Sequence, residues 1–328
     1  MTASAIWVLT DDRPGTATQA LAVAERLGRP FIEKRLRYDG LAKLPNALRG
    51  ASLLGIDDAS REALIPPWPD LVIGAGRRCA PVARWIKHQG AQVAGHPVIL
   101  VQVMHPGRAG AADFDLIALP RHDCTTPGGD AANVLRVTGA PNRITADGLV
   151  QARAKWEPVL AGLQRPRIAL LVGGATNRRP FPTATAADLG RRVAAMARAA
   201  GGSIMLATSR RTGKPAEAAL TETVPEPRSV FFWGQGGENP YLGFLAFADA
   251  VVVTGDSVSM CSEACATGKP VFIAAPVDIT APKHRRLHQE LYAAGYARPL
   301  DGTYATWTYA PLNAAAEIAA AVRRLLAP

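Results

Sequence analysis

Short apolar runs alternate along the chain with longer segments in which apolar residues recur at helical spacing. In the first half, the apolar runs cover residues 5–10, 31–36, 70–73, 97–104 and 114–119. Several of them are apolar almost throughout, which is typical of strands buried on both faces of a parallel sheet. The segments between them, such as ALAVAERLG with Gly28 as its stop, predict helices that cover the sheet.

The same alternation starts again after a crossing segment at residues 138–156, which leads into a helix ending near Gly162. The second set of apolar runs covers residues 167–172, 203–208, 230–233, 250–254 and 270–274. A helix is expected over 185–200, and a terminal amphipathic helix over 314–326 with Asn313 as its N-cap. We therefore predict an α/β protein with two Rossmann-like domains that face a cleft, covering residues 1–150 and 151–328.

The most informative loop, residues 255–260, follows the strand 250–254 and opens a helix that contains Glu263. Free N–H groups at a helix start favour an anion, and Ser257 and Ser259 add hydroxyl donors. Glu263 lies one to two turns further on, where an acid can hydrogen-bond the vicinal diol of a ribose. The alternative is that Asp256 and Ser257 only cap the helix and that Glu263 is solvated.

Three other loops follow predicted strands at the same sheet edge, where doubly wound folds bind ligands. The loop at 173–179 begins with two glycines, which let the backbone approach a ligand closely. The loop at 208–213 carries hydroxyls and two guanidinium groups suited to a diphosphate. The loop at 232–235 has aromatic and backbone groups that suit a flat base. The sequence contains neither a P-loop nor the G-x-G-x-x-G dinucleotide motif.

Composition narrows the class of protein. Hydrophobic residues make up 48% of the 328, which excludes an intrinsically disordered chain. The four cysteines form no C-x-x-C pair, so we expect reduced, buried thiols. There is no signal peptide and no apolar run of the ~20 residues that a membrane helix needs, which predicts a cytoplasmic protein. The net charge of +10 calls for an anionic partner: nucleic acid, lipid headgroups or a phosphorylated small molecule.

A basic segment, residues 77–88, suits docking to anionic headgroups on the inner leaflet of a membrane, unless it is an ordinary solvated helix with Trp85 in the core. Nucleic-acid binding is disfavoured, because the arginines are scattered and aromatic residues make up only 6%. His284 and His288 stand four residues apart, but no Glu follows His284, so we expect no metal site. His105 and His122 follow strands of the first domain and are candidates to orient an acceptor or to serve as a base, or are loop residues without chemistry.

The stretch ADAVVVTGDSVSMCSEACATGKPVFIAAP resembles the donor-site strand, loop and helix of GT-B glycosyltransferases. Together with WVLTDDRPGTATQALAVAERLG, VGGATNR, TSRRT, ENPYLGF and KHRRLH, it is similar to the mitochondrial-fission family over nearly the whole chain. That family is named after a plant protein that recruits dynamin to mitochondria. The resemblance implies a GT-B-like fold, whose last helix crosses back onto the first domain, and a nucleotide-sugar site in the second domain.

By this resemblance, Glu263 matches the acid that holds the ribose, and Ser257 and Ser259 match the phosphate contacts. Asp11 and Asp12 match the place of a catalytic base or acceptor contact, without a choice between them. The residues expected to bind the nucleotide-sugar are Gly173, Gly174, Thr176, Asn177, Thr208, Ser209, Arg210, Arg211, Phe232, Trp233, Asp256, Ser257, Ser259, Met260 and Glu263.

The resulting functional expectation is a glycosyltransferase without a metal or other cofactor, which uses a nucleotide-sugar, most readily a UDP-sugar, as substrate. The acceptor is unidentified, and a lipid-linked sugar at the membrane surface would suit the basic charge. Two alternatives stay open: a nucleotide-sugar epimerase, and a non-enzymatic scaffold that recruits a partner protein at a membrane.

Overall fold

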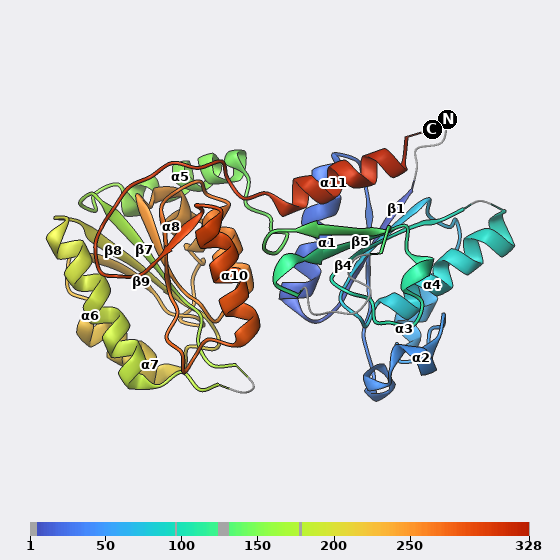
Figure 1. Cartoon of the computed structure of the whole chain (residues 1–328), viewed down its shortest axis with the longest axis horizontal. Coiled ribbons are helices and arrows are strands. Elements are labelled where there is room, and N and C mark those ends of the chain that lie inside the picture. Colours follow the sequence, from blue (N-terminus) through green and yellow to red (C-terminus); the bar gives the residue numbers. More distant parts are fainter. Residues whose placement is uncertain (1–4, 96, 124–130, 177–178, 328) are drawn as a thin grey trace. The chain divides into compact units, whose positions relative to one another are not determined.

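A computed structural model describes residues 5–95, 97–123, 131–176 and 179–327. The chain divides into two compact units (Figure 1). Unit 1 comprises Met1–Arg143 together with Asn313–Pro328, and unit 2 comprises Ile144–Leu312. The chain therefore enters unit 2 once and returns to unit 1 for its final helix.

Unit 1 is built on a six-stranded parallel sheet in the order β2-β1-β3-β4-β5-β6. Its strands are β1 (Ile6–Thr10), β2 (Ile32–Arg35), β3 (Leu71–Ala75), β4 (Ile99–Val103), β5 (Leu116–Pro120) and β6 (Val134–Val137). Its α-helices are α1 (Pro14–Leu27), α2 (Asn46–Arg49), α3 (Asp58–Glu62), α4 (Ala80–Gln89) and α11 (Ala314–Leu325), with short turns at η1 (Gly40–Lys43), η2 (Gly90–Ala94), η3 (Ala111–Asp113) and η4 (Arg121–Asp123).

Unit 2 repeats this architecture with a parallel sheet in the order β12-β11-β10-β7-β8-β9. Its strands are β7 (Arg167–Val172), β8 (Ser203–Thr208), β9 (Arg228–Phe231), β10 (Ala250–Thr254), β11 (Val271–Ala274) and β12 (Ala297–Pro299). Its helices are α5 (Ala146–Leu160), α6 (Thr183–Ala199), α7 (Lys214–Thr223), α8 (Tyr241–Phe247), α9 (Val258–Cys265) and α10 (Pro282–Ala293).

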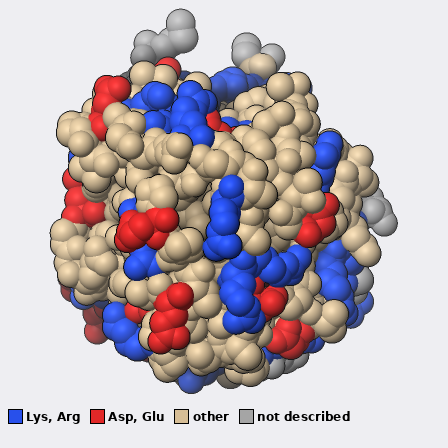
Figure 2. Space-filling view, turned by 90° about the vertical axis from the view of Figure 1, so that its left-hand side faces the viewer, with Lys and Arg blue, Asp and Glu red and all other residues tan. Residues whose placement is uncertain are grey.

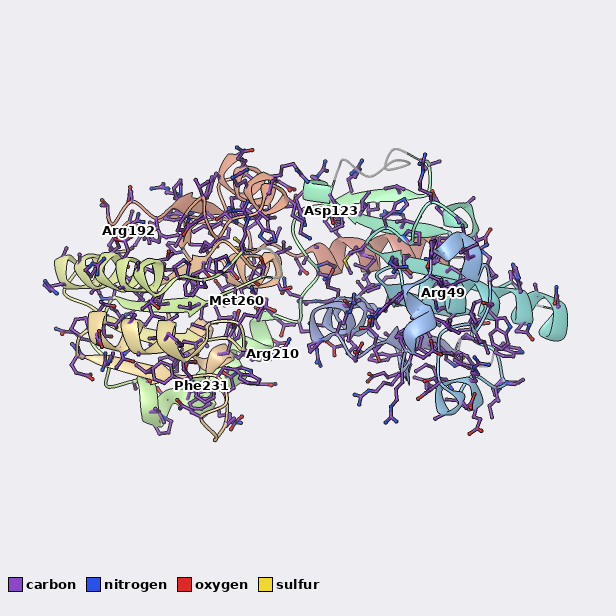
Figure 3. All side chains as sticks on the ribbon, turned by 90° about the horizontal axis from the view of Figure 1, so that it is seen from below. Arg49, Asp123, Arg192, Arg210, Phe231 and Met260 are labelled. Carbon is purple, nitrogen blue, oxygen red and sulfur yellow. The ribbon has the colours of Figure 1, made fainter. Side chains whose placement is uncertain are left out.

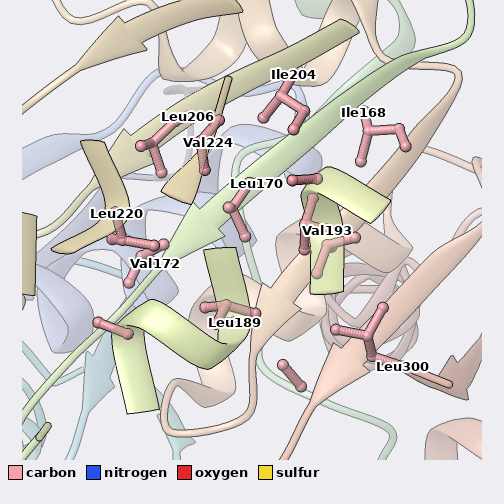
Figure 4. Packing of buried hydrophobic residues seen from close by; sticks show 14 of the residues in the cluster. Ile168, Leu170, Val172, Leu189, Val193, Ile204, Leu206, Leu220, Val224 and Leu300 are labelled. Atoms are coloured by element: carbon pink, nitrogen blue, oxygen red, sulfur yellow. The ribbon is translucent and has the colours of Figure 1, made fainter. Parts of the chain in front are cut away.

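Both faces of each sheet are buried, as the continuous apolar runs predict. In unit 2, the side chains of β7 and β8 that point to one face pack against α6 and α7, and Figure 4 shows Leu170 and Val172 next to Leu189 and Val193. Side chains of the opposite face pack against α5, α8, α9 and α10. Because helices cover both faces, polar groups of a ligand can reach the sheet only at a strand end.

The strand order has one reversal point in each unit. In unit 2 the chain moves outward from β7 through β8 to β9, and then returns to β10 on the other side of β7. In unit 1 the corresponding neighbours are β1 and β3. In open α/β sheets the loops at the carboxyl ends of such neighbouring strands diverge and leave room for a ligand. The loops after β7 and β10, and after β1 and β3, are therefore the first places to look for a site.

The predicted N-cap of the last helix is confirmed, because the Asn313 side chain accepts a hydrogen bond from the Ala316 amide at 3.1 Å. Two short edge strands, β6 and β12, and the segment from η1 to α3 are absent from the sequence prediction. The strand expected over 230–233 is wrong at its end, since β9 stops at Phe231 and leaves Trp233 in the following turn. There the Phe232 amide bonds the Gln235 side chain instead of a neighbouring strand.

The basic residues of α4 and of the turn before it have acidic or carbonyl partners. Arg84 pairs with Asp113, Lys87 pairs with Asp115, and Trp85 packs edge-on against the buried Trp68. Figure 2 shows a face of the molecule on which basic side chains likewise lie next to acidic ones. Within the described part of the chain, no helix is both long and apolar enough to span a membrane.

Candidate functional site

The start of α9 is the centre of the candidate site in unit 2. Ser257 is its N-cap and accepts a hydrogen bond from the Met260 amide at 3.3 Å. The amides of Val258 and Ser259 lie in the first turn, where a helix has no carbonyl to offer them. Ser259 and Glu263 are four residues apart and therefore share one face of the helix. A single ligand that lies along this face can touch the helix start and the glutamate.

Asp256, just before this N-cap, is a buried tie between three loops. Its Oδ2 accepts from the Gly174 amide at 2.9 Å and pairs with Arg211 Nη1 at 2.7 Å. Its side chain has no exposed surface. Within the described chain, Oδ1 is buried without a hydrogen-bond partner. Asp256 therefore fixes the loops after β7, β8 and β10 relative to one another.

The two glycines after β7 are required by this packing. Gly174 has a φ of +142°, and a Cβ on it would overlap the carbonyl oxygen of Arg211. A Cβ on Gly173 would overlap the carboxylate of Asp256. The Gly173 amide donates to Thr254 Oγ1 at 2.7 Å, so both glycine amides already have protein acceptors. These glycines shape the site by letting its loops meet.

The hydroxyls that follow β8 are also engaged within the protein. Ser209 Oγ donates to the Gly173 carbonyl at 2.5 Å, and Thr208 Oγ1 donates to Glu217 at 2.8 Å. Thr208 Oγ1 also accepts from the Trp233 amide at 2.9 Å. The indole of Trp233 itself is half exposed.

The two neighbouring arginines play different parts. Arg211 Nη1 donates to the carbonyls of Gly174 and Ala175 at 3.0 and 3.1 Å, in addition to its contact with Asp256. Arg210, labelled in Figure 3 together with Met260, is exposed, and the described residues give it no hydrogen bond or ion pair. Of these two arginines, Arg210 is therefore the one whose guanidinium has no partner among the described residues.

Glu263 is held by a residue that the sequence analysis did not select. Tyr241, the first residue of α8, donates its hydroxyl to Glu263 Oε2 at 2.6 Å. Burial raises the pKa of Glu263, and the hydrogen bond from Tyr241 opposes that rise. Burial and the adjacent carboxylate raise the pKa of Tyr241 well above its usual value, so the phenol remains a donor. One glutamate oxygen, Oε2, is thus oriented by the protein.

The remaining predicted residues of this site differ in position. Met260 is half buried against the core under α9. The Thr176 amide and carbonyl pair with those of Arg179 in a tight turn. Asn177 lies outside the described residues. The motif ENPYLGF contains Tyr241, but only the fold shows that this tyrosine lies beside Glu263.

In unit 1, the two aspartates after β1 have distinct surroundings. Asp12 is exposed and pairs with Arg78 Nη1 at 3.2 Å. Asp11 is half buried, and its Oδ1 accepts from the Arg13 amide at 3.1 Å. Burial is the largest of the effects that raise the pKa of Asp11. Asp11 therefore has a proton affinity above its ordinary value, as a general base needs, whereas Asp12 is exposed and paired with an arginine.

The histidines and cysteines offer no metal cluster in the part of the chain that the structure describes. His284 and His288 are buried on α10, and the ring of His288 lies against Gly255. Burial lowers the pKa of His105, which accepts from the Gly107 amide. The thiols of Cys79, Cys261 and Cys265 are free and buried.

Solved structures with a similar fold include two enzymes named as UDP-GlcNAc 2-epimerases. That of Methanocaldococcus jannaschii matches with a TM-score of 0.56 and 13% identity, over 98% of this chain and 99% of its own. That of Neisseria meningitidis, solved with UDP-GlcNAc bound, has a TM-score of 0.52 and 12% identity, over 98% and 99% of the two chains. At these identities the likeness concerns the fold, which is α/β and GT-B-like as the sequence predicts.

Sequence relatives extend over the whole molecule. An uncharacterised protein of Rickettsia prowazekii is 27% identical over 358 aligned positions that cover 97% of each chain. The mitochondrial fission protein ELM1 of Arabidopsis thaliana is 30% identical over 302 positions, covering 84% of this chain and 68% of its own. The sequence profile described as Mitochondrial fission ELM1 matches residues 14–326, from the first helix of unit 1 to the last. The chain therefore belongs to the mitochondrial fission ELM1 family.

Proposed function

We propose that unit 2 binds a nucleotide-sugar along α9 and that the chain transfers the sugar to an acceptor held by unit 1. The observation that carries the proposal is the hydrogen bond from Tyr241 of α8 to Glu263, which lies on the same face of α9 as Ser259. A carboxylate that is oriented by one donor and keeps a second oxygen for a diol suits a ribose. The helix start beside it suits the phosphates.

The groups that would stabilise the leaving diphosphate follow from the site. They are the first-turn amides of α9, the hydroxyl of Ser259 and the guanidinium of Arg210. Fixed donors of this kind stabilise charge as it develops, which is the role that a metal ion plays in other transferases. The buried contacts of Asp256 and Arg211 hold the loops in place before the ligand arrives, so little ordering remains to be done on binding.

The comparisons with solved structures support the class of ligand, a nucleotide-sugar. Proteins with a similar fold were solved with UDP-GlcNAc, and one of them with UDP as well. Both proteins are named as UDP-GlcNAc 2-epimerases, which favours a second candidate reaction, epimerisation of the sugar of a nucleotide-sugar. The two reactions share the nucleotide site and differ in the need for an acceptor. Asp11 is the base that we assign to the acceptor hydroxyl if the transfer inverts configuration.

The test of the nucleotide site is titration calorimetry of the full chain with UDP, GDP, ADP and CMP. We expect one of them to bind, UDP most readily, and Glu263→Gln to weaken that binding by about tenfold to a hundredfold, because a buried partner is left unsatisfied. Glu226→Gln is the matched control, since Glu226 lies just before β9, at the amino end of the strands, whereas the site lies at their carboxyl ends. Absence of binding by all four nucleotides would favour the partner-recruiting scaffold.

The test of the reaction is incubation with the UDP-sugar in deuterated water, followed by NMR. An epimerase that inverts a carbon by removing its proton introduces deuterium without an acceptor. A transferase leaves that carbon unlabelled and releases the nucleotide only when an acceptor is supplied. Deuterium in the sugar would overturn the transferase and leave the nucleotide site standing.

A further inference from the structure

A second group of polar side chains lies at the carboxyl edge of the sheet in unit 1. The segment from Tyr38 to Ile56, which contains η1 and α2, reaches this edge: Asn46 Nδ2 donates to the carbonyls of Arg77 and Pro106 at 2.8 and 2.6 Å. Those two carbonyls follow β3 and β4 respectively. The segment therefore covers the loops next to the strand reversal between β1 and β3, where this fold class binds ligands.

Arg49, at the end of α2, is a buried cation that makes no ion pair with any described residue. Only 2% of its surface is exposed. Its Nε donates to the Leu54 carbonyl at 3.0 Å, and its Nη1 donates to the Arg78 carbonyl at 3.2 Å. Among the described residues, the buried Nη2 has no hydrogen-bond partner and no carboxylate lies within 4.0 Å of the guanidinium. Figure 3 labels Arg49 in its place in unit 1.

Tyr38 adds a second unpaired donor beside this arginine. Its hydroxyl is buried without a partner among the described residues, and the guanidinium carbon of Arg78 lies 5.5 Å from the centre of its ring. Burial raises the pKa of Tyr38, so the hydroxyl keeps its proton, while the charge of Arg49 acts in the opposite direction. Each of the two groups lies in the electrostatic field of the other.

The surrounding acids do not neutralise Arg49. Asp12 is paired with Arg78. Asp39 opposes the lowering of the Arg49 pKa by burial, but it is exposed and its carboxylate accepts from the Leu41 amide at 2.7 Å, with no ion pair to Arg49. Asp11 acts on Tyr38 rather than on Arg49. A buried water molecule would satisfy hydrogen bonds but would leave the charge uncompensated, and a buried unpaired charge is costly. An anion satisfies both requirements.

We propose that unit 1 binds an oxyanion, a phosphate or carboxylate group, between Arg49 Nη2 and the Tyr38 hydroxyl. Arg49 Nη2 can only donate, and the protonated hydroxyl of Tyr38 has a hydrogen to donate, which matches the oxygens of such an anion. Asn46 Oδ1, one helical turn before Arg49, is a third buried atom without a partner and would accept from a hydroxyl of the same ligand. Under the proposed function the anion is a group of the acceptor, but the site stands without the donor site.

The experiment measures hydrogen exchange of the full chain with inorganic phosphate against chloride at equal ionic strength. In the wild type, phosphate slows exchange in peptides covering residues 36–57. Tyr38→Phe weakens this response by about tenfold or more, because a hydrogen bond to a charged group is lost. Arg49→Lys weakens it too, while it keeps a positive charge in the fold. Tyr296→Phe, in unit 2, is the control and leaves the response unchanged.

A second measurement separates binding from folding. Tyr38→Phe removes a buried hydroxyl that has no partner in the free protein, so the variant unfolds at a temperature equal to or above that of the wild type. Slower exchange in peptides covering residues 254–263 reports the donor site independently. The proposal is overturned if phosphate leaves residues 36–57 unaffected in the wild type, or if Tyr38→Phe responds as the wild type does.

Discussion

Replacing Asp256 tests whether the donor loops are held by one buried carboxylate. In Asp256→Ala the Gly174 amide loses its acceptor, which costs about 1–3 kcal/mol for a buried group. The contact with Arg211 adds at most ~1 kcal/mol, because a third of that side chain is exposed. Removal of the unpaired Oδ1 offsets part of this loss. The net cost is about 2 kcal/mol, which lowers the melting temperature of a domain of this size by roughly 4–8 °C.

Asp256→Asn separates charge from hydrogen bonding. Both observed contacts end on Oδ2, so an asparagine oxygen in that position keeps them and its amide takes the place of Oδ1. Only the strengthening by the negative charge is lost, about 1 kcal/mol, or roughly 2–4 °C. Asp188→Asn is the control in the same unit, because Asp188 is exposed and lies 3.7 Å from Arg191.

The assay is scanning calorimetry of the full chain, with hydrogen exchange of peptides covering 167–176 and 250–258 to assign the change to unit 2. The expected order of destabilisation is alanine, then asparagine, then the control. An alanine variant that melts with the control would refute the view that Asp256 ties the loops together.

Two further predictions concern proton equilibria. Asp11→Asn lowers turnover by about a hundredfold or more and leaves nucleotide affinity unchanged in calorimetry, whereas the exposed Asp58→Asn alters neither. Because the pKa of Asp11 is raised, wild-type turnover falls as the pH drops through that raised value, and a flat acid limb would contradict its role as base. Burial lowers the pKa of Lys269 to about 8 from an ordinary 10.5. Between those values the unfolded chain keeps a proton that the folded chain has released, so the contribution of Lys269 to stability rises with pH by up to ~1.4 kcal/mol per pH unit. The buried thiols of Cys79, Cys261 and Cys265 contribute in the opposite direction, because burial raises their pKa values. Urea unfolding of the wild type and of Lys269→Met at pH 8 to 10 checks this: the stability of the wild type relative to the variant rises with pH.

The sequence alone predicts the buried central strands, but it does not predict β6 and β12 at the edges of the sheets. Strands β1, β3, β7 and β10 are almost entirely apolar, and this composition predicts their burial on both faces. The edge strand β12 has three residues, of which two are exposed, so it lacks an apolar pattern to read. The segment around α2 has the same difficulty, because its fold depends on bonds from Asn46 to loops far along the chain.

For the site, the residue types predicted which loops carry polar groups, but not whether those groups face a ligand or bond to other parts of the protein. Gly174 and Arg211 lie in the expected loops, but they bond within the protein: Arg211 Nη1 donates to the Gly174 carbonyl, and the Gly174 amide donates to Asp256. A sequence cannot tell an arginine that faces a ligand from one that faces a carbonyl, since both need the same side chain. The same limit applies to Glu263, whose partner Tyr241 stands on a different helix.

The two candidate sites differ in whether their polar groups are already hydrogen-bonded within the protein. In unit 2 the described polar groups after β7 and β8 hydrogen-bond to one another, which fixes the loops and leaves the helix start, Arg210 and one oxygen of Glu263 for the proposed ligand. In unit 1 the buried hydroxyl of Tyr38 and Nη2 of Arg49 have no hydrogen-bond partner among the described residues. Buried donors without partners destabilise the free protein, so a ligand that supplies the acceptor binds more favourably. Saturating phosphate should therefore stabilise unit 1 against unfolding through Arg49 and Tyr38, whereas the loops of unit 2 are already fixed by their own hydrogen bonds.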